Sequence, residues 1–226
     1  MTHLDIEPLR DLNDLKYGIH KRWIYRDSLS QETLGNYLQK ICFSICDLNK
    51  TFSQKTFDYK DMVFIICLVD WIRESVNCIS SLFKEGILND FHFSSQETLN
   101  KAKKYFVAIR SFVVAHPLET TRHTYFSLDG TYICVDFFQN DVPMVSKNEP
   151  DERFRFIDYD GLHQGYVKTD FYLKVYSSKY YQNKFYLLIG FNLEDIVRYA
   201  RLCIQKIYEL DKYLFKLKIK DFKEVV

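Results

Sequence analysis

The chain has 226 residues, of which 47% are hydrophobic, 27% are charged and 17% are aromatic, and its formal net charge at pH 7 is +1. This composition is sufficient for a packed core, and the balanced charge excludes a protein that coats nucleic acid through net charge alone. The most apolar run, residues 62–69, is far shorter than the ~20 residues that span a bilayer, and the acidic start of the chain is not typical of a signal peptide, so we expect a cytoplasmic protein with no membrane partner.

Four segments show the three- and four-residue spacing of apolar side chains that is typical of helices. They cover about residues 30–52, 59–83, 94–116 and 192–216. A further short helix over residues 6–16 also fits the pattern. Ser94 followed by Glu97 has the spacing of a capping box, in which each side chain satisfies a backbone N–H at the helix start. Pro117 is expected to end the third helix, so that His116 lies at or just beyond its last turn.

A different pattern, with a period of two, follows the third helix and predicts strands. It covers residues 131–138, 154–158, 166–176 and 185–189. The polar residues 177–184 can form the turn of a hairpin, whereas His163, close to Gly161, is typical of a turn. We therefore predict a mainly α protein with a single domain over residues 1–226. It is a bundle of four to five helices, with a small antiparallel β insertion at residues 124–191 before the last helix.

Motifs for metals and cofactors are missing from the sequence. The six cysteines are Cys42, Cys46, Cys67, Cys78, Cys134 and Cys203. Most lie in apolar runs and none forms a C-x-x-C pair, so we expect reduced thiols buried in the core. Cys42 and Cys46 share a helix face and could ligate a metal, but no matching Cys or His pair lies nearby. The sequence has no glycine-rich phosphate loop, zinc-ligand spacing or serine-hydrolase motif, and we expect no metal and no cofactor.

The segment Arg110-Ser-Phe-Val-Val-Ala-His116 carries the clearest chemical potential. A guanidinium matches phosphate oxygens, and an imidazole titrates near neutrality, so the two can supply the charge neutralisation and proton transfer of RNA cleavage without a metal. On an ideal helix the two side chains point roughly 120° apart. Either the helix loosens before Pro117, or the site forms between two copies of the chain. Alternatively, both side chains cap the helix carbonyls and complement the helix dipole.

The longer segment Ala-Ile-Arg-Ser-Phe-Val-Val-Ala-His resembles the R-x(4–6)-H signature of the HEPN superfamily, with Arg110, polar Ser111, an apolar stretch and Ala115-His116 in the family's places. The resemblance covers about the helical two-thirds of the chain and leaves the β insertion unmatched. It implies a helical bundle that forms a homodimer through the motif helices. It also implies a metal-independent endoribonuclease that leaves a 2′,3′-cyclic phosphate, of the kind found in toxin–antitoxin, abortive-infection and CRISPR systems, with an antitoxin or defence-system protein as a possible partner.

The resemblance assigns a role to each motif residue. Arg110 would bind the scissile phosphate of RNA, His116 would act as acid or base, and Ser111 would orient one of them. Ser111 stands where the family often has Asn or Asp. The same resemblance therefore covers a non-catalytic HEPN-like dimeric module that binds a partner protein, a nucleotide or RNA. A helical interaction protein in which the motif is accidental is a third interpretation.

Asp70 and Glu74 are candidate supporting residues in the second helix. They lie four residues apart and share a helix face, so they could hold Arg110 or the motif histidine in place. Alternatively, the two carboxylates are solvated or pair with Arg73 or Lys84.

Basic residues on both sides of the motif are further candidates for contact with substrate. Arg122 and His123 could line the path of the RNA, although a polar loop explains them as well. Lys101, Lys103 and Lys104 precede the motif on the same helix and could attract RNA phosphates. A cluster of charges is also a common feature of a solvated helix face.

Overall fold

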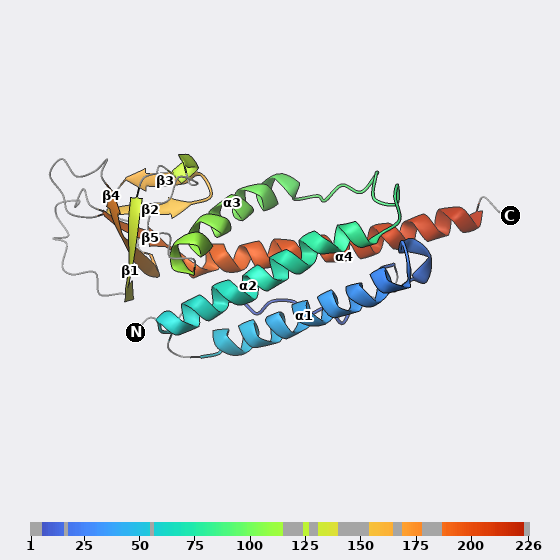
Figure 1. Cartoon of the computed structure of the whole chain (residues 1–226), viewed down its shortest axis with the longest axis horizontal. Coiled ribbons are helices and arrows are strands. Elements are labelled where there is room, and N and C mark those ends of the chain that lie inside the picture. Colours follow the sequence, from blue (N-terminus) through green and yellow to red (C-terminus); the bar gives the residue numbers. More distant parts are fainter. Residues whose placement is uncertain are drawn as a thin grey trace. The chain divides into compact units, whose positions relative to one another are not determined.

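The computed structural model describes residues 6–15, 18–54, 57–114, 124–126, 131–139, 154–164, 169–177 and 187–223. Its helices in these ranges are α1 (Ser28–Phe52), α2 (Tyr59–Ile79), α3 (Gln96–Val113) and α4 (Leu193–Lys223), with single turns at η1 (Arg22–Ile24), η2 (Ser80–Leu82) and η3 (Thr124–Phe126). The strands are β1 (Thr131–Gln139), β2 (Phe154–Asp158), β3 (Gly161–Gln164), β4 (Phe171–Ser177) and β5 (Leu187–Phe191) (Figure 1). A mainly helical chain with strands before its last long helix is therefore confirmed.

The chain divides into two compact units that are discontinuous in sequence. The first comprises Met1–Asp5, Lys55–Ile66 and Asn100–Arg198, and the second comprises Ile6–Gln54, Cys67–Leu99 and Tyr199–Val226. The divisions fall within α2, α3 and α4, so each of these helices contributes residues to both units. All five strands and the described part of the Arg110 motif belong to the first unit, whereas α1 belongs to the second.

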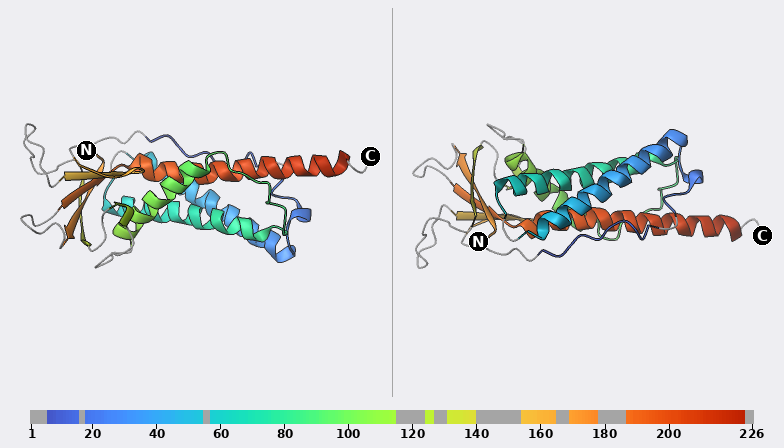
Figure 2. Two further views of the ribbon diagram at one scale, coloured as in Figure 1. Left: turned by 90° about the horizontal axis from the view of Figure 1, so that it is seen from above. Right: turned by 90° about the horizontal axis from the view of Figure 1, so that it is seen from below.

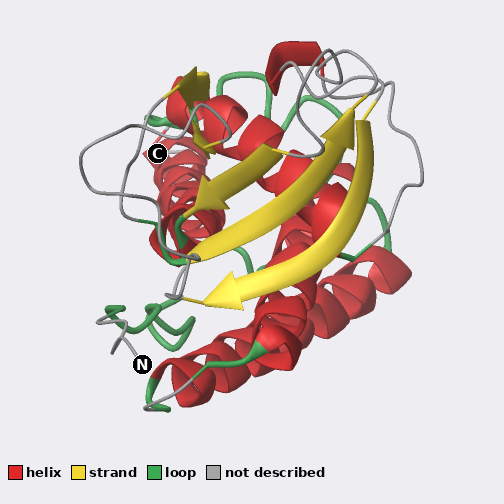
Figure 3. Cartoon of the chain, turned by 90° about the vertical axis from the view of Figure 1, so that its left-hand side faces the viewer, coloured by secondary structure: helices red, strands yellow, loops and turns green. Residues whose placement is uncertain are grey.

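The strands of the first unit form one sheet with the order β1-β4-β5-β2-β3 (Figure 3). The pairs β1–β4, β4–β5 and β2–β3 are antiparallel, and the predicted hairpin corresponds to β4 and β5. However, β2 and β5 are parallel, so the prediction of an antiparallel insertion is wrong and the sheet is mixed. The chain returns from β4 to insert β5 between β4 and β2, where β5 satisfies the backbone groups of both neighbours.

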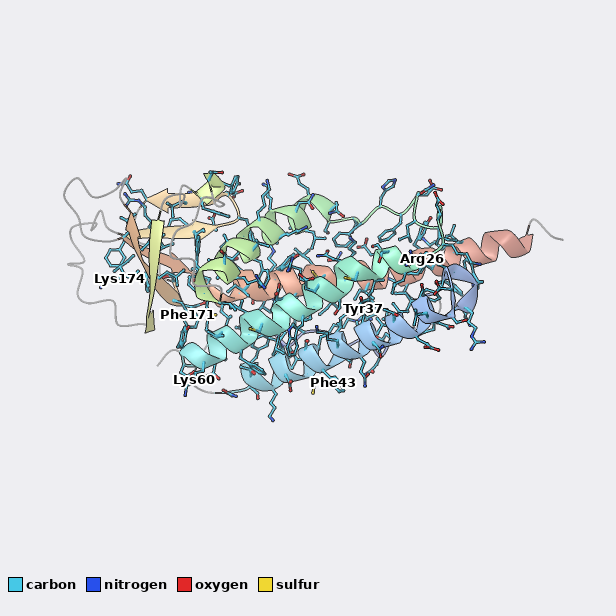
Figure 4. All side chains as sticks on the ribbon, in the orientation of Figure 1. Arg26, Tyr37, Phe43, Lys60, Phe171 and Lys174 are labelled. Carbon is cyan, nitrogen blue, oxygen red and sulfur yellow. The ribbon has the colours of Figure 1, made fainter. Side chains whose placement is uncertain are left out.

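The register gives the sheet two chemically different faces, because successive side chains of a strand point to opposite sides. One face is apolar and buried, and includes Ile157, Phe171, Leu173, Ile189 and Phe191. The other face, which we call the aromatic face, includes Phe154, Phe156, Asp158, His163, Tyr172 and Lys174. Phe171 and Lys174 lie on opposite sides of β4 (Figure 4).

In the second unit, α1 lies antiparallel to the second-unit part of α2 (Figures 1 and 2). The Nζ atom of Lys40 lies 5.1 Å from the ring centroid of Trp71. Asp211 of α4 is buried and accepts hydrogen bonds from the backbone N–H groups of Gly18 (2.9 Å) and Ile19 (3.0 Å). A single carboxylate oxygen thus fixes the loop before η1 against the last helix.

Residues 6–15 are not helical, so the short helix predicted over residues 6–16 is wrong. The Asn49 side chain accepts the Leu9 N–H (2.7 Å) and donates to the Leu9 carbonyl (2.9 Å), while Asp11 accepts the N–H of Asn13 (2.9 Å). Side chains therefore form hydrogen bonds with backbone groups that would pair with one another in a helix. The apolar residues of the segment, including Leu9 and Leu12, are nevertheless buried.

The start of α3 differs from the predicted capping box. Ser94 donates its N–H to Glu209 Oε2 (2.9 Å) and its hydroxyl to Glu209 Oε1 (2.5 Å), so the carboxylate comes from α4 rather than from Glu97. The tertiary contact replaces the local one because both donors of Ser94 reach one carboxylate in a bidentate arrangement, which is stronger than two neutral hydrogen bonds.

The cysteines also differ from expectation. Cys42 and Cys46 are exposed, Cys67 and Cys78 are partly exposed, and Cys203 is buried, so the prediction of core thiols is wrong for the pair on α1. Among the described residues, no group of three or more His, Cys, Asp or Glu side chains is placed to hold a metal ion. In the same part of the chain, every helix is too short or too polar to cross a membrane.

Candidate nucleic-acid interface

The part of α3 in the first unit is amphipathic, and its outer side is basic. Its inner side is buried and includes Ala102, Tyr105, Phe106, Ile109 and Phe112. Its outer side consists of Asn100, Lys103, Lys104, Val107, Arg110 and Ser111, which we call the α3 stripe. These residues recur at spacings of three and four, so they line up along one helix face. The two lysines are exposed and Arg110 is partly exposed, so three cations follow this face.

A cleft of about 640 Å³ lies along the stripe. It is lined by Asn100, Lys103, Lys104 and Val107 on one side and by Thr124, Tyr125 and Phe126 of η3 on the other. The Lys104 Nζ atom lies 5.1 Å from the centroid of the Tyr125 ring, and that ring is half exposed. Phe126 is buried and meets Tyr125 edge to face at 4.9 Å. The cleft therefore offers an ammonium group and an aromatic ring side by side, a combination that suits a base and its phosphate.

The turn between β2 and β3 adjoins this cleft (Figure 1). The Tyr125 hydroxyl donates to the Tyr159 carbonyl (3.3 Å), and Lys101 Nζ lies 3.3 Å from Asp160 Oδ1. Tyr159 is itself anchored, because its ring meets the Tyr105 ring edge to face at 5.1 Å and its hydroxyl donates to the backbone carbonyl of Asp195. The β2–β3 turn is thus attached to α3, η3 and the start of α4.

Beneath this turn, burial changes the titration of two groups. Burial raises the pKa of Tyr105 well above its usual value, and the neighbouring Asp195 and Tyr159 act in the same direction. Burial also raises the pKa of Asp195 to about 6, although Arg198 opposes the shift. The Arg198 guanidinium lies 5.3 Å from the centroid of the Tyr159 ring. The buried side chains of α3 are therefore uncharged near neutral pH, and the cations of this helix face outward.

The structure describes only part of the Arg110 motif. The last hydrogen bond at the end of α3 runs from the Val114 N–H to the Arg110 carbonyl (2.9 Å), and α3 ends at Val113. The helix thus ends at Val113, and the prediction that Pro117 ends it with His116 at or just beyond the last turn falls on residues outside the described ranges. Arg110 and Ser111 are partly exposed at the end of the α3 stripe. The remainder of the motif, from Ala115 through His116, lies outside the described residues, as do Arg122 and His123. The convergence of Arg110 and His116 stays a prediction.

Asp70 and Glu74 lie in the second unit, where both pair with Arg73. The Arg73 Nε atom is 2.7 Å from Asp70 Oδ1, and Arg73 Nη2 contacts Glu74 Oε1. Asp70 is buried, with 8% of its surface exposed, whereas Glu74 is exposed. The pairing with Arg73 that the sequence left open is therefore present in the structure.

Comparisons with protein-family models, curated proteins and solved structures give no match for this chain. The resemblance to the HEPN superfamily accordingly stays a prediction.

Two aromatic features of the site were missed by reasoning from the sequence. The first is Tyr125-Phe126, whose signal was an aromatic pair one residue after the basic pair Arg122-His123. The second is His163, which belongs to strand β3 rather than to a turn, so its assignment to turn chemistry was wrong. Its signal was the strand pattern at residues 154–158, which lies shortly before Gly161 and so allows a second strand to pair back after the turn.

Proposed function

We propose that this protein binds RNA along the α3 stripe and cleaves it without a metal ion, with Arg110 and His116 as the reacting groups. The observation that carries the proposal is the alignment of Lys103, Lys104 and Arg110 on one accessible helix face beside the cleft at Tyr125. The resemblance of residues 110–116 to the HEPN signature supports the same conclusion from the sequence.

The stripe has the size and charge that an RNA backbone requires. From Lys103 to Arg110 the helix rises about 10 Å, which is long enough for more than one phosphate of a strand. Lysine and arginine bind such phosphates and release their counterions, and this release supplies much of the affinity of proteins for nucleic acids. The net charge of +1 is no obstacle, because the cations are concentrated where the RNA would lie.

The chemistry that we propose is transfer of the phosphate to the neighbouring 2′-oxygen. The Arg110 fork binds the two non-bridging oxygens of the scissile phosphate. As the bond from the 2′-oxygen to phosphorus forms and the bond from phosphorus to the 5′-oxygen breaks, His116 takes the proton of the 2′-hydroxyl or gives a proton to the leaving 5′-oxygen, and solvent water completes the other proton transfer. Ser111 follows Arg110 on the stripe and orients one of the reacting groups, while Arg122 and His123 would contact the RNA. In a homodimer, two copies of the motif would meet in one cleft.

The test is cleavage of a single-stranded RNA in the presence of EDTA. The wild type is expected to produce 2′,3′-cyclic phosphate and 5′-hydroxyl ends, and Arg110→Ala and His116→Ala each to lower the rate by at least about 100-fold. His92→Ala is the matched control, because His92 is exposed and belongs to the second unit. A wild type that cuts no RNA, or a His116→Ala variant that cuts as fast, would refute the cleavage proposal.

Ser111 favours one alternative, a non-catalytic HEPN-like dimeric module. It provides a shorter hydrogen-bonding group than the Asn or Asp that the resemblance leads one to expect at this position. Such a module would bind RNA, a nucleotide or a partner protein such as an antitoxin without cutting. Binding of RNA that depends on Lys103 and Lys104, without any cyclic-phosphate product from the wild type, would favour this alternative over the enzyme.

A further inference from the structure

The β2–β3 hairpin presents a histidine and a carboxylate together on the aromatic face of the sheet. The His163 Nε2 atom lies 2.9 Å from Asp158 Oδ1, and the two side chains are 38% and 37% exposed. The His163 ring also stacks on the Phe156 ring, with centroids 4.8 Å apart and planes inclined by 26°. None of these three side chains lines the cleft at Tyr125, so they form a separate feature.

This arrangement is held in place by the hairpin itself. Phe156 pairs with His163, and Asp158 pairs with Gly161, in the antiparallel register of β2 and β3. Asp158 Oδ1 also accepts the N–H of Asp160 (2.7 Å), which closes the turn. Gly161 has a φ of +130°, which side-chain-bearing residues rarely adopt. The imidazole plane is therefore fixed before any ligand binds, which lowers the entropic cost of binding.

The hairpin places His163 near the cleft. A Cβ atom on Gly161 would lie 3.9 Å from the Tyr125 carbonyl oxygen, so the face of β3 that carries Gly161 is next to η3. His163 lies two residues further along the same face of β3, about 7 Å from Gly161. A strand bound in the cleft at Tyr125 can thus continue onto His163 without leaving this face.

The surrounding charges favour a base over a phosphate at this position. Asp158 accepts a hydrogen bond from His163, whereas Asp160 in the same turn pairs with Lys101. The Asp158 carboxylate beside the ring repels an approaching phosphate, but it can accept a hydrogen bond from the amino group of a base. A planar ring that is stacked on one neighbour and is 38% exposed is a platform for a second planar ring.

We propose that His163, supported by Phe156 and Asp158, is a base-stacking subsite for one nucleotide of the RNA that the α3 stripe binds. The inference rests on the RNA-binding part of the proposed function and is independent of cleavage. Stacking tolerates any base, because every base has an aromatic face, so the subsite adds affinity without fixing the sequence. It requires an unstacked base, and the substrate is therefore single-stranded at this position.

The test uses two fluorescein-labelled octamers, a single-stranded RNA and an abasic ribose-phosphate chain of the same charge. Binding is measured by fluorescence anisotropy for two complementary variants. His163→Gln removes the ring but keeps an amide that can bond to Asp158, whereas His163→Phe keeps a ring and loses that hydrogen bond. We expect His163→Gln to weaken binding of the RNA about tenfold, to leave the abasic chain unchanged, and His163→Phe to bind both as the wild type does.

The controls separate this inference from the proposed function. Lys103→Ala combined with Lys104→Ala should weaken binding of both octamers, and His92→Ala should weaken neither.

If His163→Gln weakens both octamers equally, His163 acts through charge and the stacking proposal is overturned. If His163→Gln changes neither while the lysine variant weakens both, RNA binding stands and the subsite is overturned. If the wild type binds neither octamer, RNA binding itself is refuted, and the subsite with it. Thermal unfolding of each variant checks its fold. Because His163→Gln should weaken RNA binding and His163→Phe should not, a loss of stability shared by both variants cannot produce the expected pattern.

Discussion

The dependence of RNA affinity on salt is the most direct measure of the α3 stripe. For single strands, the logarithm of the binding constant falls with the logarithm of the salt concentration with a slope of about −0.7 for each phosphate neutralised. Three contacts, from Lys103, Lys104 and Arg110, give a slope of about −2.1, so affinity should fall about 18-fold between 50 and 200 mM salt. In the variant Lys103→Ala/Lys104→Ala one contact remains. The slope should then be about −0.7, and the fall about 2.6-fold.

The assay is fluorescence anisotropy with a labelled single-stranded octamer at four or more salt concentrations. Both lysines are exposed, and alanine is at least as favourable in a helix as lysine, so the variant should keep its fold. Lys50→Ala/Lys84→Ala removes the same charge from exposed positions of the second unit and serves as the control. Its slope should equal that of the wild type.

Two results would refute this reasoning. If the control variant flattens the slope as much as the stripe variant does, the RNA responds to total charge and not to this helix face. If neither variant alters the slope, the lysines of α3 do not contact phosphates, and the surface is an ordinary solvated helix face.

Three further predictions concern the stability of the chain and are tested by chemical or thermal unfolding. Asp211→Ala leaves the buried N–H groups of Gly18 and Ile19 without their acceptor and should lower the free energy of unfolding by about 2–4 kcal/mol. Asp211→Asn keeps the oxygen that accepts both hydrogen bonds and should lower it less. Equal losses in the two variants would contradict this role. Gly18→Ala places a Cβ 2.5 Å from that of Leu214 and should cost about 1–3 kcal/mol; an unchanged melting temperature would contradict the close approach. Burial raises the pKa of Asp195 from 3.8 to about 6, so the folded state binds this proton more tightly and stability falls as pH rises between those values. Asp195→Asn should therefore match the wild type near pH 4 and exceed it by about 1 kcal/mol at pH 7.5, after allowance for partial solvent exposure; a pH-independent difference would contradict the shift.

The sequence predicts the elements of this fold better than their contacts. The four long helices follow from the spacing of their buried residues, because the same periodicity that fills the core also sets the helix face. Local spacing could not predict which carboxylate binds Ser94, because Glu209, which takes the place of Glu97, lies 115 residues later in the chain than Ser94. Residues 6–15 have helical spacing, yet Asn49 takes the backbone groups of Leu9. Both failures arise because a distant side chain competes with a local hydrogen bond.

The candidate site was predicted only along the helix that carries it. Lys103 and Lys104 could be assigned to one face with Arg110 from spacing alone. The cleft could not, because it requires η3 to pack against that face. His163 was assigned to a turn because the glycines two residues before and after it are strong turn signals. The pairing of β2 with β3 overrides that signal and brings His163 into register with Phe156.

The bond between Ser94 and Glu209 has a consequence for synthesis of the chain. At about 5–20 residues per second, the 115 residues that separate the two take about 6–23 s to be made. Throughout that interval the nascent chain lacks the carboxylate that fastens the first turn of α3. A polypeptide that stops before Glu209 never acquires this carboxylate, so prematurely terminated products lack the two hydrogen bonds that Ser94 donates just before α3.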